Sequence, residues 1–235
     1  MLVGHGPPGS IAPSRASHQA GTTRPGKHYS SPEPVCQTAL NSDELFPSFS
    51  RLRETGTLVL STCQTKGGVV SHTEPETAYE LGRQYEASYR GCAQCVLAAL
   101  QDVFDLQDDV LFQAASGFAG GGGLCGDSAC GAYAGSIMML SRLCGRPRTD
   151  FEDQAGVLFQ NFRLVQMLHQ HFIDEYGSVI CRDIHTRIFG RPYYLADPDD
   201  LEKFDQAGGH YDKCPEVVGK AARWAAEIII SEGLI

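Results

Sequence analysis

The sequence has no apolar run long enough to cross a lipid bilayer. Its uninterrupted apolar stretches are short pieces such as residues 228–230, whereas a membrane helix needs roughly 18 to 20 apolar residues. Clusters of lysine and arginine are also missing. The chain has 19 basic residues against 28 acidic ones and a net charge of −9, and a nucleic-acid-binding surface needs basic side chains gathered on one face. These absences predict a protein that is not integral to a membrane and binds no nucleic acid.

Signals for secretion and for common enzyme sites are missing as well. The chain starts without the basic region and apolar core of a secretory signal. Its nine cysteines are an odd number, so complete pairing within one chain would leave one thiol over. Both observations predict a reducing, cytoplasmic location. There is no Ser/His/Asp arrangement and no H-E-x-x-H, and the glycines at 120–123 lack the Gly-Lys-Ser/Thr of a phosphate-binding loop. The sequence therefore assigns no catalytic residue and no enzyme class.

Composition divides the chain into two parts. Residues 1–73 are rich in Gly, Pro, Ser, Thr and His and show no sustained helical or strand period, which predicts a low-complexity, disordered tail. From Glu74 onward the pattern is helical, and a hydrophobic content of 42% is enough for one sizeable core. We therefore expect one all-α domain over residues 74–235, with six or seven helices in an orthogonal or bundle-like array and no internal repeat.

Apolar spacing and capping residues predict where these helices lie. They are expected over residues 74–89, 92–105, 109–116, 127–144 and 149–176, in a short turn at 181–185, and from 214 onward. The glycines at 120–123 should open a flexible loop. Cys214 and Pro215 suit the cap and first position of the last helix, a placement that should lower the pKa of the thiol. The core stripe of the long helix is expected at Leu158, Phe162, Val165, Leu168 and Phe172.

Four cysteines fall on separate predicted helices: Cys92, Cys130, Cys181 and Cys214. A helical core has no packing need for such a set. The four thiols can meet only if the fold brings them together, and converging thiolates favour soft metals, iron–sulfur clusters or disulfide exchange. Three of them lie at or near predicted helix starts, where backbone N–H groups can donate to sulfur. The pattern therefore predicts that these four residues bind a cofactor or metal.

Small residues surround the second of these cysteines. Gly131, Ala132 and Gly135 form a small-residue surface on the helix that follows Cys130, so something must approach this surface closely. A neighbouring helix is one candidate, because glycines spaced by four let two backbones pack tightly. An inorganic cluster bound by Cys130 is the other, and the two are compatible.

The same residues carry a family resemblance. From about residue 76 to about residue 227 the chain resembles the small redox-active family named for its C, GCAxxG, C, C pattern, to which the split-Soret cytochromes are related. The CGAxxG core lies within residues 116–140, the first cysteine stands in a CAQ context, the third precedes an RD pair and the last stands in a CPE context. The resemblance implies redox activity with the four cysteines as site residues. Cys95 and Cys125 depart from the simplest pattern.

Haem does not follow from the resemblance. The split-Soret relatives carry c-type haem, whose attachment requires CxxCH. Here Val96 follows the second cysteine of the CxxC pair. We therefore expect no c-type haem.

An iron–sulfur cluster held by the four cysteines is the leading interpretation, and the function expected from it is electron transfer or redox sensing with a redox partner protein. A thiol–disulfide protein that uses Cys92 with Cys95, or Cys125 with Cys130, is the first alternative, although no thioredoxin-like βαβ pattern is present. A structural zinc domain with four cysteine ligands is the second, although the ligand spacing is wide. A brown colour would distinguish the cluster from both.

The sequence leaves open the role of His185 and the number of chains that form the site. His185 follows Cys181 by four residues, so both face one side of a helical turn. Such a pair can ligate zinc or an iron–sulfur centre, although a surface or hydrogen-bonding histidine is the commoner outcome. A homodimer in which two chains share the site is also compatible with the sequence.

Overall fold

A computed structural model describes residues 73–235. The tail predicted for residues 1–73 lies outside the described residues, apart from Thr73. The described part is all-α and has no strand, which confirms the predicted fold class. Its α-helices are α1 (Glu74–Tyr89), α2 (Cys92–Phe104), α3 (Asp109–Ala114), α4 (Gly131–Cys144), α5 (Val157–Tyr176), α6 (Cys181–Phe189), α7 (Pro198–Gln206) and α8 (Cys214–Ser231). None of these helices is both long and apolar enough to span a membrane.

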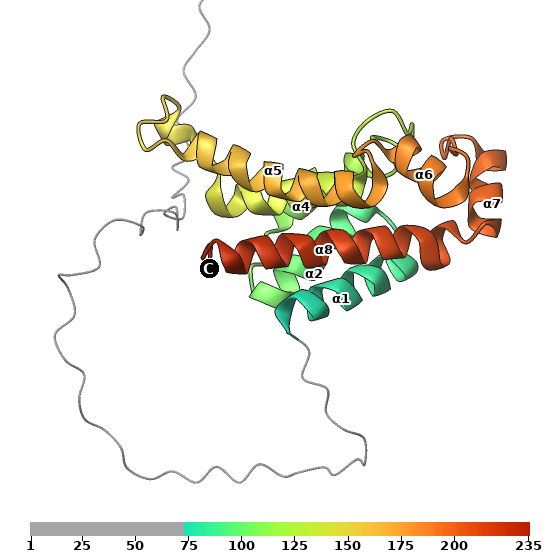
Figure 1. Ribbon diagram of the computed structural model, residues 1–235, viewed down its shortest axis with the longest axis horizontal. Coiled ribbons are helices and arrows are strands. Elements are labelled where there is room, and N and C mark those ends of the chain that lie inside the picture. The colour runs from blue at the N-terminus through green and yellow to red at the C-terminus, as the bar shows by residue number, and fades with distance from the viewer. Residues whose placement is uncertain (1–72) are drawn as a thin grey trace, which may run out of the picture. The chain divides into compact units, whose positions relative to one another are not determined.

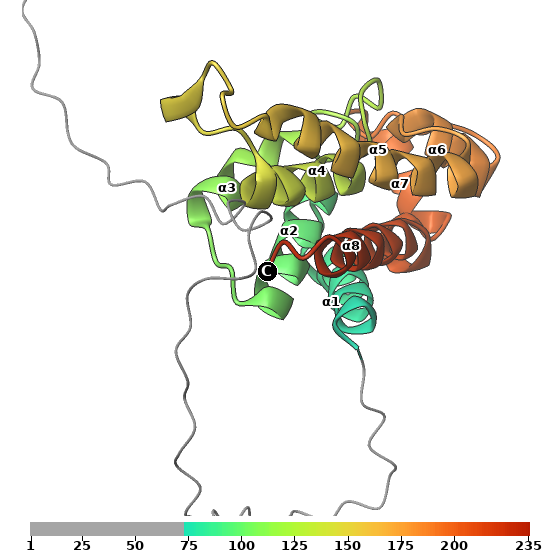
Figure 2. The same ribbon diagram turned by 60° about the vertical axis from the view of Figure 1, so that its left-hand side comes forward.

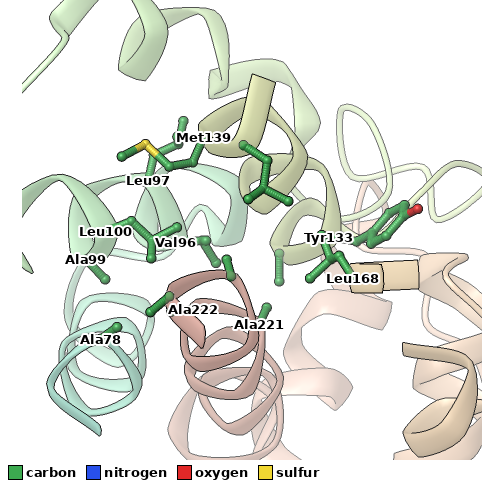
Figure 3. Packing of buried hydrophobic residues seen from close by; sticks show 14 of the residues in the cluster. Ala78, Val96, Leu97, Ala99, Leu100, Tyr133, Met139, Leu168, Ala221 and Ala222 are labelled. Carbon is green, nitrogen blue, oxygen red and sulfur yellow. The ribbon is translucent and has the colours of Figure 1, made fainter. Parts of the chain in front are cut away.

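Helix α8 is the centre of the packing. It contacts α1, α2, α4 and α5, and in Figures 1 and 2 it runs beside α1 and below the pair formed by α4 and α5. Small side chains allow the close approach of α1, α2 and α8. Ala78, Ala99 and Ala222 are fully buried where the three helices meet, as Figure 3 shows. The inward face of α8 is fully apolar and buried, and it includes Val218, Ala221, Ala222, Ala225 and Ile229.

Two predicted helix starts are wrong. Helix α4 begins at Gly131 rather than near residue 127, because Ala129 forms an isolated antiparallel bridge with Ile180 and the chain there is extended. Helix α5 begins at Val157 rather than at the Thr149-Asp150 cap. A short 3-10 turn, Arg148–Asp150, comes first, and residues with positive φ interrupt the helix between the two.

The core stripe predicted for α5 is also partly wrong. Phe162 is 47% exposed. The buried face is instead formed by Asn161, Leu164, Leu168, Phe172 and Tyr176. Leu168 and Phe172 belong to both sets, so the error lies in the first half of the helix. There the same 3.6-residue period fits two neighbouring faces, and the contacts with α4 and α8 decide between them.

An eighth helix, α7, has no counterpart among the six or seven predicted. It begins with Pro198 after Asp197, whose carboxylate accepts a hydrogen bond from the backbone N–H of Asp199 at 2.8 Å. Phe204 is its one buried residue. With Tyr193 and Leu195, this ring forms a second, smaller hydrophobic cluster. Helices α6 and α7 lie together at one end of the bundle (Figure 1).

Candidate functional site: a cavity lined by four cysteines

All four predicted cysteines lie at helix starts. Cys92, Cys181 and Cys214 are the first residues of α2, α6 and α8, and Cys130 directly precedes α4 as its cap residue. A helix start presents free backbone N–H groups and the positive end of the helix dipole. The fold thus brings four such ends, each carrying a sulfur, to one region of the bundle.

The glycine-rich loop of residues 119–129 aligns two of these starts. The sequence predicts a flexible segment here, but the loop is closed by several backbone hydrogen bonds of its own. Its end pairs with the segment that precedes α6. The N–H of Cys181 donates to the carbonyl of Ser128 at 3.1 Å, and the N–H of Cys130 donates to that of Val179 at 2.8 Å. Cys130 and Cys181 are therefore held side by side by main-chain contacts.

One cavity of about 220 Å³ is lined by all four cysteines, and we call it the four-cysteine cavity. Besides the cysteines, the ionisable residues that line it are Glu86, Arg90, His185 and His210. The remaining wall is largely apolar and includes Ile184, Leu195, Leu201, Phe204, Val217 and Val218. Sulfur atoms here face a medium of low polarity, in which electrostatic interactions are stronger than in water.

The sulfurs form two contact groups within the cavity. The thiol of Cys92 hydrogen-bonds with Cys130. The sulfurs of Cys181 and Cys214 lie 3.7 and 3.8 Å from the same atom, Nε2 of His185. Within residues 73–235, no three His, Cys, Asp or Glu side chains stand ready to hold a single metal ion.

Two glycines of the CGAxxG motif make this geometry possible. A Cβ atom at Gly131 would overlap the sulfur of Cys92 and lie 2.9 Å from the carbonyl oxygen of Phe118. A Cβ atom at Gly135 would overlap the carbonyl oxygen of Ala93 and lie 3.0 Å from its Cα. The neighbour expected at this surface is thus a helix, α2. Its close packing also puts the sulfur of Cys92 beside the start of α4.

Three of the four thiols, those of Cys92, Cys181 and Cys214, are protonated at neutral pH. The pKa of the Cys92 thiol is raised well above the usual value by a hydrogen bond with Cys130 and by burial. The pKa of the Cys214 thiol is raised in the same way by burial and by the charge of Glu86. Burial raises the pKa of Cys181 to about 12. The expectation that its helix start lowers the pKa of the Cys214 thiol is therefore wrong, because desolvation of the thiolate outweighs the helix dipole.

Glu86, on α1, brings a buried carboxyl group to the cavity. It is 3% exposed, and its Oε2 has no hydrogen-bond partner among the described residues. Burial raises the pKa of Glu86 to about 7, although the neighbouring Cys95 thiol and the charge of Arg90 act in the opposite direction. Ionisation of this carboxyl is therefore costly in the folded protein.

This cost predicts a pH-dependent effect of Glu86→Gln in the metal-free protein. Between the ordinary pKa of a glutamate and about 7, the folded state binds more protons than the unfolded state. Wild-type stability therefore falls as the pH rises through this window, and the loss is complete above it. Glutamine does not ionise. We expect Glu86→Gln to gain about 2.5 kcal/mol relative to wild type between pH 5 and pH 8, at 1.36 kcal/mol per pKa unit.

Urea unfolding at both pH values measures this gain. Glu80→Gln is the matched control, because Glu80 is exposed on the same helix and should show no such pH dependence. Equal effects of Glu86→Gln at pH 5 and pH 8 would contradict the buried, proton-binding carboxyl.

The two extra cysteines of the motif region lie outside the four-cysteine cavity. Cys95 is 3% exposed, and its thiol donates to the carbonyl oxygen of Arg90 at 3.1 Å. It belongs to a neighbouring surface groove with Tyr85 and Tyr89. Cys125 is exposed on the glycine-rich loop. No disulfide joins any two of the cysteines within residues 73–235.

No motif marks Glu86 or His210 in the sequence. A signal for Glu86 nevertheless exists, since Ala78, Gly82 and Glu86 are spaced by four and are the buried residues of α1. A carboxyl at the end of such a small-residue stripe points to a buried ionisable group. His185 is brought to the cavity together with Cys181, as the helical spacing of the pair predicts.

Comparison with known proteins agrees with the motif. No curated protein and no solved structure shows significant similarity to the chain. A family model described as "Putative redox-active protein (C_GCAxxG_C_C)" matches residues 91–228. The match spans more than half of the sequence and includes all four cavity cysteines. The chain therefore belongs to this family of redox-active proteins.

Proposed function

We propose that the four-cysteine cavity binds an iron–sulfur cluster and that the protein transfers or senses electrons through it. The observation that supports this most is that four thiols from four helix starts line one cavity. The thiolate ligands of an iron–sulfur cluster are distributed over two or more iron atoms, so the sulfurs need not surround a single point. When bound, the cluster would supply one-electron redox chemistry. The ligands would be the cavity cysteines: Cys92, Cys130, Cys181 and Cys214.

The surrounding residues suit such a centre. A backbone hydrogen bond from Gly120 reaches Cys92, and each helix start offers further N–H groups to sulfur. The largely apolar wall lowers the polarity around the sulfurs, which is one of the means by which proteins adjust the potential of a cluster. Binding as thiolates releases the protons that the free thiols hold, so loading should become more favourable as the pH rises.

Anaerobic purification tests the proposal directly. We expect a brown protein with visible absorbance and with iron and acid-labile sulfide in comparable amounts per chain. A colourless protein that contains stoichiometric zinc would instead support a structural zinc domain. A colourless protein without metal, whose free thiol count changes on reduction, would support thiol–disulfide chemistry.

Thiol–disulfide chemistry is the second candidate because Cys92 hydrogen-bonds with Cys130. This pair differs from both pairs that the sequence suggests. Its oxidation would join the two sulfurs and pass two electrons and two protons to a disulfide oxidant such as oxidised glutathione. Exchange starts from a thiolate, and the raised pKa of Cys92 makes that state rare at neutral pH. Cluster binding also needs thiolates, but it accounts for all four cysteines that line the cavity, whereas the dithiol uses only two of them. The cluster is for this reason the better-supported candidate.

The setting proposed with this function is a reducing one. A cytoplasmic location would keep the buried thiols available as ligands, and electrons would be exchanged with a separate redox protein. A homodimer that shares the centre is a further arrangement, and the mass of the loaded protein in solution tests it.

A further inference from the structure

His185 is the polar side chain that two of the cavity sulfurs share. Its Nε2 lies 3.7 Å from Sγ of Cys181, one helical turn earlier on α6. The same nitrogen lies 3.8 Å from Sγ of Cys214, at the start of α8. Both distances are within the range of hydrogen bonds that involve sulfur. One ring nitrogen thus connects cysteines from two different helices.

Aromatic neighbours fix the orientation of this ring. His185 is 3% exposed and stacks on Phe204, with 5.1 Å between the ring centroids and an interplanar angle of 28°. Phe189 and Tyr193 meet it edge-on at 5.5 and 6.2 Å. A ring held on three sides cannot turn Nε2 away from the sulfurs without displacing these aromatic side chains.

The surroundings of Nδ1 indicate which ring nitrogen of His185 carries the proton. A neutral imidazole carries one N–H, on either Nδ1 or Nε2. The Nδ1 of His185 is buried and has no hydrogen-bond partner in residues 73–235. A buried N–H without a partner is rarer in proteins than an acceptor without one. The tautomer with a bare Nδ1 and the proton on Nε2 is therefore favoured.

We propose that His185 is a positioning residue, which donates its Nε2–H to the sulfurs of Cys181 and Cys214 and thereby orients them and adjusts the potential of the centre. The part that concerns the potential rests on the proposed function. Donation to a ligating sulfur stabilises the reduced, more electron-rich state. Loss of the donor should therefore lower the reduction potential while the four thiolate ligands stay in place.

The first experiment uses the metal-free protein and does not depend on a cluster. In ¹⁵N-histidine-labelled protein at pH 7, the ring of His185 should show the chemical shifts of the neutral Nε2–H tautomer. Its signals are assigned by their disappearance in His185→Phe. Signals of the Nδ1–H tautomer would overturn the proposal, because Nε2 would then carry no proton to donate.

The second experiment uses the loaded protein. His185→Phe keeps an aromatic ring against Phe204 but removes the donor, so we expect unchanged iron content and a reduction equilibrium constant about tenfold lower, equivalent to about 59 mV for one electron. His185→Gln restores an N–H donor and should recover part of this shift. His210→Phe is the matched control. It makes the same exchange in the same cavity wall, but the His210 ring pairs with Asp205 rather than with a sulfur.

The outcomes separate the donor from other roles. Loss of iron in His185→Phe, with a normal melting temperature, would make His185 a ligand and overturn the proposal. An unchanged potential in both His185 variants would also overturn it. If wild type loads no cluster, the proposed function fails, and the tautomer experiment still decides whether His185 donates to the two thiols.

Discussion

Cys130→Ser and Cys214→Ser are each expected to reduce bound iron to a small fraction of the wild-type content. Each exchange replaces a soft, anionic sulfur ligand by a hard, neutral hydroxyl. The two cysteines line the same cavity from the starts of different helices, α4 and α8, so either loss leaves only three thiolates. Iron and acid-labile sulfide per chain, determined after anaerobic purification, measure the effect.

Cys125→Ser and Cys95→Ser are the matched controls. The first changes an exposed thiol on the neighbouring loop, and the second changes a buried thiol outside the four-cysteine cavity. Both should retain iron, with only a local packing cost for the second. Full iron content in Cys130→Ser and Cys214→Ser would contradict the proposal that these cysteines bind a cluster. The Cys92–Cys130 dithiol predicts instead that Cys130→Ser loses redox activity while Cys214→Ser keeps it.

The second large effect is expected from Gly135→Ala, which should lower the free energy of unfolding by about 3 kcal/mol. The new Cβ would overlap the carbonyl oxygen of Ala93, in the backbone of α2. Backbone atoms within a helix cannot move aside as the end of a side chain can. The helices α2 and α4 would have to separate, and Cys92, which adjoins Ala93, would move away from the start of α4.

Gly117→Ala provides the control for this variant. A Cβ atom at Gly117 would meet nothing within 4 Å, so the substitution should leave stability unchanged or raise it slightly by restricting the unfolded chain. Thermal and urea unfolding of both variants measure the difference. A wild-type-like stability of Gly135→Ala would show that the contact between α2 and α4 is looser than described.

Capping residues and apolar spacing in the sequence were enough to predict the helix bounds that depend on neighbouring residues in the chain. The bounds of α1 and α2 follow from a Pro-containing first turn and a regular apolar stripe. The four cysteines could be chosen because they occupy the positions of the family's cysteine pattern, which sets them apart from Cys95 and Cys125. The small-residue surface of α4 likewise predicted a close neighbour, and the structure shows that α2 is this neighbour.

Features that depend on tertiary contacts could not be predicted in the same way. Ala129 looks like part of a helix until its bridge with Ile180 is known. Phe162 fits a core stripe by period alone, yet nothing packs over it closely enough to bury it. The pKa of Cys214 illustrates the same point for the site. Its helix start is visible in the sequence, whereas the burial that outweighs the dipole depends on residues from α1, α6 and α7.

The spread of the four cysteines over the chain has a mechanical consequence. They belong to α2, α4, α6 and α8, so a group bound to all of them would act as a multiple cross-link between distant segments. Such a cross-link restricts the unfolded chain through the long loops that it closes, as a disulfide does. The loaded protein should therefore resist unfolding with an unchanged apolar core, and a chain cut between α4 and α5 should stay joined until the centre is lost.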